Sequence, residues 1–183
     1  MSKSMVHVSF DTVETFVPRI PSYRIEGELE EDSITERICA SLTILGALRG
    51  IPHGGDVLFQ MKRLGLPIII HAYYLEGEYV IPTEQQVPDW CVTDEVWFLQ
   101  TPERIRRVDY RITDFELLPV EGVEHSFQFV LNASMKRCPY GDNKENLCDL
   151  FEKKKPKVFD KYSFREIMLN LGDNLFSLIQ ERS

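Results

Sequence analysis

The sequence predicts an α+β domain in which strands dominate the middle of the chain and helices lie near residues 43–51 and at the C-terminus. Three observations support this class. Stretches rich in β-branched and aromatic residues recur between residues 66 and 135. An N-capped apolar stretch marks the first helix. A capping box followed by apolar residues at helical spacing marks the last one.

The length and composition are those of one compact domain. The chain has 183 residues, of which 43% are apolar and 27% are charged. Domains typically have about 100–200 residues, and this balance of apolar and charged residues is typical of globular proteins. We therefore expect residues 1–183 to form a single domain.

Extended structure is expected at the start of the chain. The stretch VHVSF (6–10) alternates apolar and polar residues, which predicts a short strand. Pro18 and Pro21 follow, and each forces the residue before it out of helical geometry. The segment between this strand and residue 32 is therefore expected to be extended or looped.

Two interpretations compete for residues 33–50. Ser33 and Glu36 have the spacing of a capping box, so one helix could cover the whole stretch. Alternatively, RICAS (37–41) is a short strand, and Thr43 is the N-cap of a helix over ILGALRGI that ends at Pro52. We favour the second interpretation, which also fits the resemblance described below.

Strand signals dominate the rest of the central region. A short helix is expected within 54–65, followed by a hairpin over 66–82 that is built from LPIIIHAYYL and YVIP. A polar connection leads to EVWFLQ (95–100), and TPERIRR separates this strand from VDYRITDFELLP (108–119). HSFQFVLNASM (125–135) is expected to be a further strand.

The last quarter of the chain combines a charged loop with an amphipathic helix. Residues 136–160 are rich in charge and turn-forming residues, so we expect them to be the most mobile part. In residues 163–182, Ser163 and Glu166 form a capping box, and seven apolar residues form a stripe along one side.

The net charge of −8 argues against duplex nucleic acid as a partner, because it repels a polyanion. Two short basic stretches, RIRR (104–107) and KKKPK (153–157), are interpreted as solvated faces or loops. No stretch approaches the roughly 20 apolar residues that cross a bilayer, so no membrane partner is expected.

Cysteines and histidines are spread widely and predict no metal site. The four cysteines include no C-x-x-C pair, which fits a reducing, cytoplasmic compartment. The four histidines stand far apart in sequence and are interpreted as structural or surface residues. The chain also lacks a phosphate-binding P-loop, a G-x-G-x-x-G turn, a G-x-S-x-G elbow and an H-E-x-x-H motif.

The order of the remaining polar groups resembles the ADP-ribosyltransferase-like superfamily, which includes RES-domain toxins and RNA 2′-phosphotransferases. VPRIPSYR places arginines in an early extended segment, RICASLT places hydroxyls where a strand meets a helix, and DEVWFL places an acid at the start of a later strand. CVTDEVWFLQTPERI also looks like the E-x-W strand of some of these proteins. The resemblance covers residues 6–118.

The resemblance implies an NAD-binding protein that transfers ADP-ribose or hydrolyses NAD, in a toxin or defence role. In such proteins an Arg or His on an early strand, a Ser or Thr region and a later acid surround the nicotinamide end of NAD. Carried over by position, Arg19 and Glu95 would be catalytic, and Arg24, Ser41 and Thr43 would bind the cofactor. An aligned carboxylate can stabilise the positive charge that develops on the ribose.

Two other functions remain open. An acidic, aromatic-rich surface is compatible with a non-enzymatic factor that docks on a host protein, as an immunity or anti-defence inhibitor does; Glu28, Glu30 and Glu31 would carry it. The residues of the expected cleft would also suit a protein that binds a small nucleotide without turnover. The oligomeric state is not predicted.

Overall fold

The computed structural model describes residues 4–21, 31–63, 68–120 and 127–138. These residues form six strands and three helices. In chain order they are β1 (Met5–Ser9), β2 (Ile38–Ser41), α1 (Ile44–Arg49), α2 (Gly54–Arg63), β3 (Ile68–Glu76), α3 (Trp90–Thr93), β4 (Glu95–Phe98), β5 (Arg104–Val120) and β6 (Phe127–Arg137). The expected mixture of helices and strands, with strands predominant, is confirmed.

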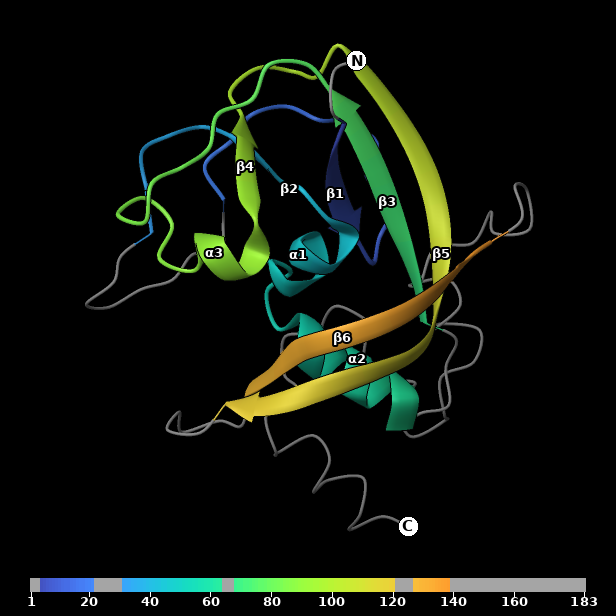
Figure 1. Ribbon diagram of the computed structural model, residues 1–183. Helices are drawn as coiled ribbons and strands as arrows, with labels where there is room; N and C mark the ends of the chain where they lie inside the picture. Colours follow the sequence, from blue (N-terminus) through green and yellow to red (C-terminus); the bar gives the residue numbers. More distant parts are fainter. Residues whose placement is uncertain (1–3, 22–30, 64–67, 121–126, 139–183) are drawn as a thin grey trace, which may run out of the picture.

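The six strands form one antiparallel sheet in the order β4-β2-β1-β3-β5-β6 (Figure 1). Several central sheets were expected, and the described residues contain one. Strand β5 is long and curved: its first part pairs with β3 and its last part pairs with β6. Two register shifts interrupt the β5–β6 ladder, between Ile112 and Asp114 and between Glu116 and Leu117. Such irregularities bend and twist a strand. In Figure 1, β6 and the last part of β5 therefore run at a steep angle to β1 and β3.

Each face of the sheet has its own hydrophobic core. On one face, helices α1 and α2 pack against β1 and β3, and Leu48, Leu58 and Ile70 are fully buried there. On the other face, Phe16 from the segment after β1 packs against Tyr73 and side chains of β2 and β4. The segment that contains Pro18 and Pro21 thus covers the sheet in place of a helix.

The pairing between β1 and β2 is short. Val6 and Ser41 are the residue pair in register between these two strands, whereas β1 and β3 pair along five residues. The two strands therefore diverge beyond this pair. At the point of divergence His7 Nδ1 lies 2.8 Å from the carbonyl oxygen of Cys39, so a side-chain contact replaces the backbone ladder.

The junction at residues 38–50 follows the interpretation that places a strand before the helix. Thr43 is extended, with φ −135° and ψ 154°, and its side chain accepts a hydrogen bond from the Gly46 amide at 2.9 Å. This is the N-cap that the sequence predicted. The alternative single helix over 33–50 is wrong, since Ile38–Ser41 lies in the sheet.

Helix α2 fits closely against β6. A Cβ atom added to Gly55 would lie 1.9 Å from the carbonyl oxygen of Gln128, so the two backbones approach each other as only glycine permits. The Gln128 amide donates to Asp56 Oδ1 at 3.1 Å. These contacts fix the turn between α1 and α2 relative to the sheet.

Three expectations are corrected. Residues 66–82 do not form a hairpin, because β3 pairs with β1 and β5 while Val80 forms an isolated bridge with Trp97 of β4. The connection between β4 and β5 is shorter than the expected TPERIRR, because Arg104–Arg107 belong to strand β5, where they form an exposed face. The polar connection before β4 contains the short helix α3.

Other expectations lie outside the described residues or have only a partial counterpart. The C-terminal helix over 163–182 and residues 139–160 of the expected loop lie outside them. Residues 136 and 137 end strand β6. Within the described ranges no helix has both the length and the apolar character needed to cross a membrane. Cys39 and Cys91 are free thiols.

Candidate functional site

A cavity of about 980 Å³ opens beside the point where β1 and β2 diverge. One wall is the extended segment from Thr12 to Pro21. Residues of β2 and β4 form its floor, and the turn from Arg49 to His53 between α1 and α2 closes another side. Ligand sites typically occupy about 300–1,000 Å³, so the space suits a ligand as large as a nucleotide.

Glu95, at the start of β4, lines this cavity and is held in place. The indole nitrogen of Trp97 donates to Glu95 Oε1 at 2.7 Å, and the Cys39 thiol also hydrogen-bonds to the Glu95 carboxyl group. Burial raises the pKa of Glu95, and the nearby carboxyl groups of Glu31 and Asp89 raise it further. The two hydrogen bonds act in the opposite direction because they favour the charged form.

Cys39 lies between Glu95 and the diverging strand β1. It stands opposite Trp97 in the β2–β4 ladder, and its backbone oxygen is the contact of His7. Burial, followed by the charge of Glu95, raises the pKa of the Cys39 thiol. The thiol is therefore protonated at neutral pH and acts as a hydrogen-bond donor, not as a nucleophile.

His7 lines the cavity from β1. Its ring stands edge-on to Phe16, with the ring centroids 5.3 Å apart, and lies 6.3 Å from the ring of Tyr73. Burial lowers the pKa of His7, and the charge of Arg19 lowers it further. Since Nδ1 faces a carbonyl oxygen, Nδ1 carries the proton and a neutral ring keeps Nε2 as an acceptor.

Two arginines attach the extended segment to the sheet. The backbones of Arg19 and Arg37 exchange two hydrogen bonds, of 3.1 and 2.9 Å. The Arg37 side chain is fully buried; it pairs with Glu31 and Asp32 and lies 4.3 Å from the centre of the Trp97 ring. The Arg19 side chain, by contrast, is exposed at the cavity.

The structure brings two of the predicted site residues, Arg19 and Glu95, to this cavity. Ser41 and Thr43, which were expected to bind the cofactor, do not line it. Ser41 is buried, and its Oγ donates to the Thr93 carbonyl at 2.7 Å. Thr43 caps α1, and its Oγ1 lies 3.3 Å from Asp94 Oδ2. Arg24 lies outside the described residues.

Sequence reasoning missed His7, Cys39 and Arg37 as residues of the site. His7 is the second residue of the predicted strand VHVSF, and the resemblance itself allows a His on an early strand. That position was given to the arginines of VPRIPSYR, because only the fold shows that they follow β1 and do not belong to it. Nothing in RICAS alone distinguishes the buried Arg37 from a solvated one.

The cavity wall carries both signs of charge. Its acids are Glu14, Glu31, Asp89 and Glu95, and its arginines are Arg19, Arg37 and Arg49. Arg49 is bound to backbone oxygens of Val130, Leu131 and Val92. Among the described residues, no group of three or more His, Cys, Asp or Glu side chains has an arrangement that could hold a metal ion.

Comparisons with known proteins found no matching family model, no matching curated protein and no matching solved structure.

Proposed function

We propose that the cavity binds NAD and that the protein is an ADP-ribosyltransferase-like enzyme, which transfers ADP-ribose or hydrolyses NAD. The observation that carries this proposal is that His7, Arg19 and Glu95, from three separate segments, line one cavity of about 980 Å³. These are the residue types that surround the nicotinamide end of NAD in the ADP-ribosyltransferase-like superfamily, which the sequence resembles. The cavity also lies next to the strands that carry two of them, β1 and β4.

Glu95 is the proposed catalytic carboxylate. Loss of nicotinamide breaks the bond between ribose C1′ and the ring nitrogen, and the electron pair leaves with nicotinamide. Positive charge then develops on the ribose, and a fixed carboxylate stabilises it. The hydrogen bond from Trp97 fixes Glu95 Oε1, so the carboxylate needs little reorganisation as that charge appears.

The oxygen of the acceptor, which is water or a hydroxyl group of a host molecule, then bonds to C1′ and gives up its proton. This sequence of steps balances without an oxidant or a reductant. Burial raises the pKa of Glu95, so its ionised form has the higher proton affinity that suits it to orient this acceptor.

Arg19 and His7 are proposed to bind the dinucleotide. The exposed guanidinium of Arg19 at the cavity can form charge-assisted hydrogen bonds with the pyrophosphate. His7 is neutral and held by Cys39, so Nε2 can accept a hydrogen bond from a ribose hydroxyl. Both roles involve binding and orientation, not proton transfer.

Release of nicotinamide from NAD tests the proposal. We expect the wild-type protein to release nicotinamide and Glu95→Gln to lose at least about 100-fold of this activity, as when one transition-state contact is removed. The amide oxygen of the Glu95→Gln variant would still accept the Trp97 hydrogen bond, so NAD binding measured by calorimetry should persist. Glu84→Gln removes an exposed carboxylate that does not line the cavity, and it should leave release unchanged.

The outcomes distinguish an enzyme from a protein that only binds the nucleotide. Binding of NAD without release by the wild type would identify a nucleotide-binding protein without turnover and contradict the enzymatic part of the proposal. Absence of both binding and release would contradict the proposal as a whole. Equal losses in Glu95→Gln and Glu84→Gln would show that Glu95 has no special role.

A further inference from the structure

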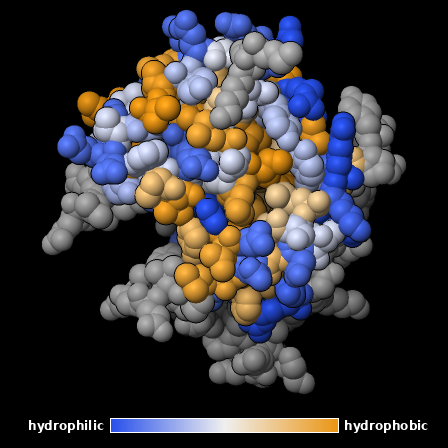
Figure 2. Space-filling model, in the orientation of Figure 1, coloured by the Kyte–Doolittle hydropathy of each residue, from blue (hydrophilic) through white to orange (hydrophobic). Residues whose placement is uncertain are grey.

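Six basic side chains lie along the first half of β5 and at the end of β6 that pairs with it, although the protein as a whole carries a net charge of −8. They lie within residues 104–111 of β5 and 136–137 of β6, and they are Arg104, Arg106, Arg107, Arg111, Lys136 and Arg137. In Figure 2 hydrophilic side chains gather along the side of the molecule where β5 runs in Figure 1.

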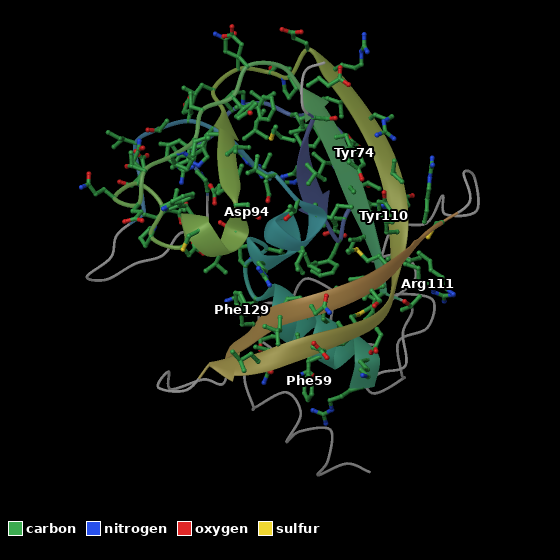
Figure 3. All side chains as sticks on the ribbon, in the orientation of Figure 1. Phe59, Tyr74, Asp94, Tyr110, Arg111 and Phe129 are labelled. Atoms are coloured by element: carbon green, nitrogen blue, oxygen red, sulfur yellow. The ribbon has the colours of Figure 1, made fainter. Side chains whose placement is uncertain are left out.

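Two tyrosines interleave with three of these arginines on one face of the sheet. Arg104 lies opposite Glu76, Arg106 lies opposite Tyr74, and Arg137 lies opposite Tyr110. The Arg106 guanidinium lies 4.6 Å from the centre of the Tyr74 ring, and the hydroxyl oxygens of Tyr74 and Tyr110 lie 2.9 Å apart. Figure 3 shows both tyrosines beside β3 and β5. We call Arg104, Arg106, Tyr74, Tyr110 and Arg137 the arginine patch.

Most of these cations lack an acidic partner. Arg104 is 3.5 Å from Glu76, and Arg107 forms two hydrogen bonds with Asp109. No ion pair joins a carboxylate of the described residues to any of the other four, which are Arg106, Arg111, Lys136 and Arg137.

Two of these four, Arg111 and Lys136, stand directly opposite each other in the β5–β6 ladder. Like charges in such a pair destabilise a sheet. Because successive residues of a strand face opposite sides, this pair lies on the other face of the sheet from the arginine patch, and its repulsion does not bear on the patch.

We propose that the arginine patch binds the phosphodiester backbone of single-stranded nucleic acid. All three cations of the patch are arginines, whose planar donor groups match phosphate oxygens in pairs, whereas lysine acts as a point charge. Half-buried tyrosines beside phosphate-binding arginines are the combination that single-strand binding surfaces use.

A single strand fits better than a duplex or an acidic peptide. The two arginines of the patch without an ion pair to a described carboxylate, Arg106 and Arg137, lie on the neighbouring strands β5 and β6, while the net negative charge of the protein would repel the second strand of a duplex. An acidic peptide would use the charges but would leave the tyrosine surface without a planar partner. The site is separate from the proposed NAD cavity, because none of its residues lines that cavity.

Fluorescence anisotropy with a labelled 20-nucleotide oligo(U) tests this inference at 25 and 150 mM KCl. The wild type should bind, and affinity should fall as salt rises. The double variant Arg106→Gln/Arg137→Gln should lose about tenfold or more of its affinity at 25 mM KCl. The slope of log K against log salt should also decrease by about 1.4, since each contact to a single strand contributes about 0.7.

The matched control is Lys62→Gln/Arg63→Gln on α2. It removes the same charge from two cations that also lie over rings, at 5.1 Å from Phe115 and 5.8 Å from Phe59. This control should bind oligo(U) as the wild type does, and thermal unfolding should show that both double variants are folded.

The inference is overturned if the wild type does not bind oligo(U) at 25 mM KCl, or if the control loses as much affinity as the patch variant. It is also overturned if polyglutamate competes as well as unlabelled oligo(U), or if a duplex of the same length binds equally tightly.

Discussion

Replacement of Gly46 by alanine should destabilise the fold through one steric conflict. A Cβ atom at this position would lie 2.3 Å from the Thr93 carbonyl oxygen and 2.4 Å from Ser41 Oγ. Neither atom can easily move, because Ser41 Oγ donates to this same carbonyl at 2.7 Å in a buried site. Relief of the conflict must therefore separate α1 from β2 and α3.

The magnitude follows from these contacts. Breaking the buried hydrogen bond leaves polar groups unsatisfied, at about 1–3 kcal/mol. Overpacking adds about 1–3 kcal/mol, and the better helix propensity of alanine returns about 1 kcal/mol. The net loss is about 3 kcal/mol, which corresponds to about 6–12 °C in Tm for a domain of this size.

Thermal unfolding followed by circular dichroism measures this loss, with Gly50→Ala as the control. Gly50 ends the same helix at φ −74°, and a Cβ there would meet its nearest atom at 3.6 Å. Alanine at this position should be neutral or stabilise by up to about 1 kcal/mol. Equal Tm values for the two variants would refute the close packing described around Gly46.

Three further predictions concern single residues in the cavity wall or next to it. Ser41→Ala should lower the free energy of unfolding by about 1–3 kcal/mol, because the Thr93 carbonyl loses its hydrogen-bond donor. Chemical denaturation measures this loss, and an unchanged midpoint would count against the contact. Arg37→Met should lower the free energy of unfolding by about 3 kcal/mol or more, since it removes the buried guanidinium that pairs with Glu31 and Asp32. A gain in stability in the same assay would contradict this. Burial makes the pKa of His7 lower in the folded protein than in the unfolded chain, so the unfolded chain binds a proton first as the pH falls. The stability that a neutral His7 contributes above pH 6.5 is therefore lost as the pH falls below that value. His7→Gln should flatten this dependence in thermal unfolding at pH 7.5 to 5.5, and an identical slope in the variant would exclude His7 as its source.

Local chemistry made part of the fold predictable. The N-cap at Thr43, the alternation in VHVSF and the apolar run before Tyr73 depend on neighbouring residues, and each gave the right element. The hairpin over 66–82 failed because strand pairing is decided by distant partners. Strand β3 is paired on both sides by β1 and β5, so Val80 finds its partner in β4.

Charge predicted correctly that RIRR is solvated, but not which element it belongs to. Its residues lie on an antiparallel strand, where exposed arginines are compatible with a ladder, so polarity did not mark the connection before the strand.

The candidate site was predictable to a similar degree. Glu95 and Arg19, which line one cavity, were singled out because their order along the chain resembles a known pattern. The divergence of β1 from β2, which exposes His7 to the same cavity, depends on the ladder and is not visible in either strand alone.

NAD binding to the wild-type protein tests the central claim most directly. Thermal shift with NAD and with ADP-ribose should show stabilisation, since a ligand at 100 times its Kd contributes about 2.7 kcal/mol. Arg19→Gln should weaken this shift, and Arg63→Gln, which changes a residue that does not line the cavity, should retain it. Absence of a shift with both ligands at millimolar concentration, or an equal shift in all three proteins, would contradict the account of the cavity as an NAD site that uses Arg19.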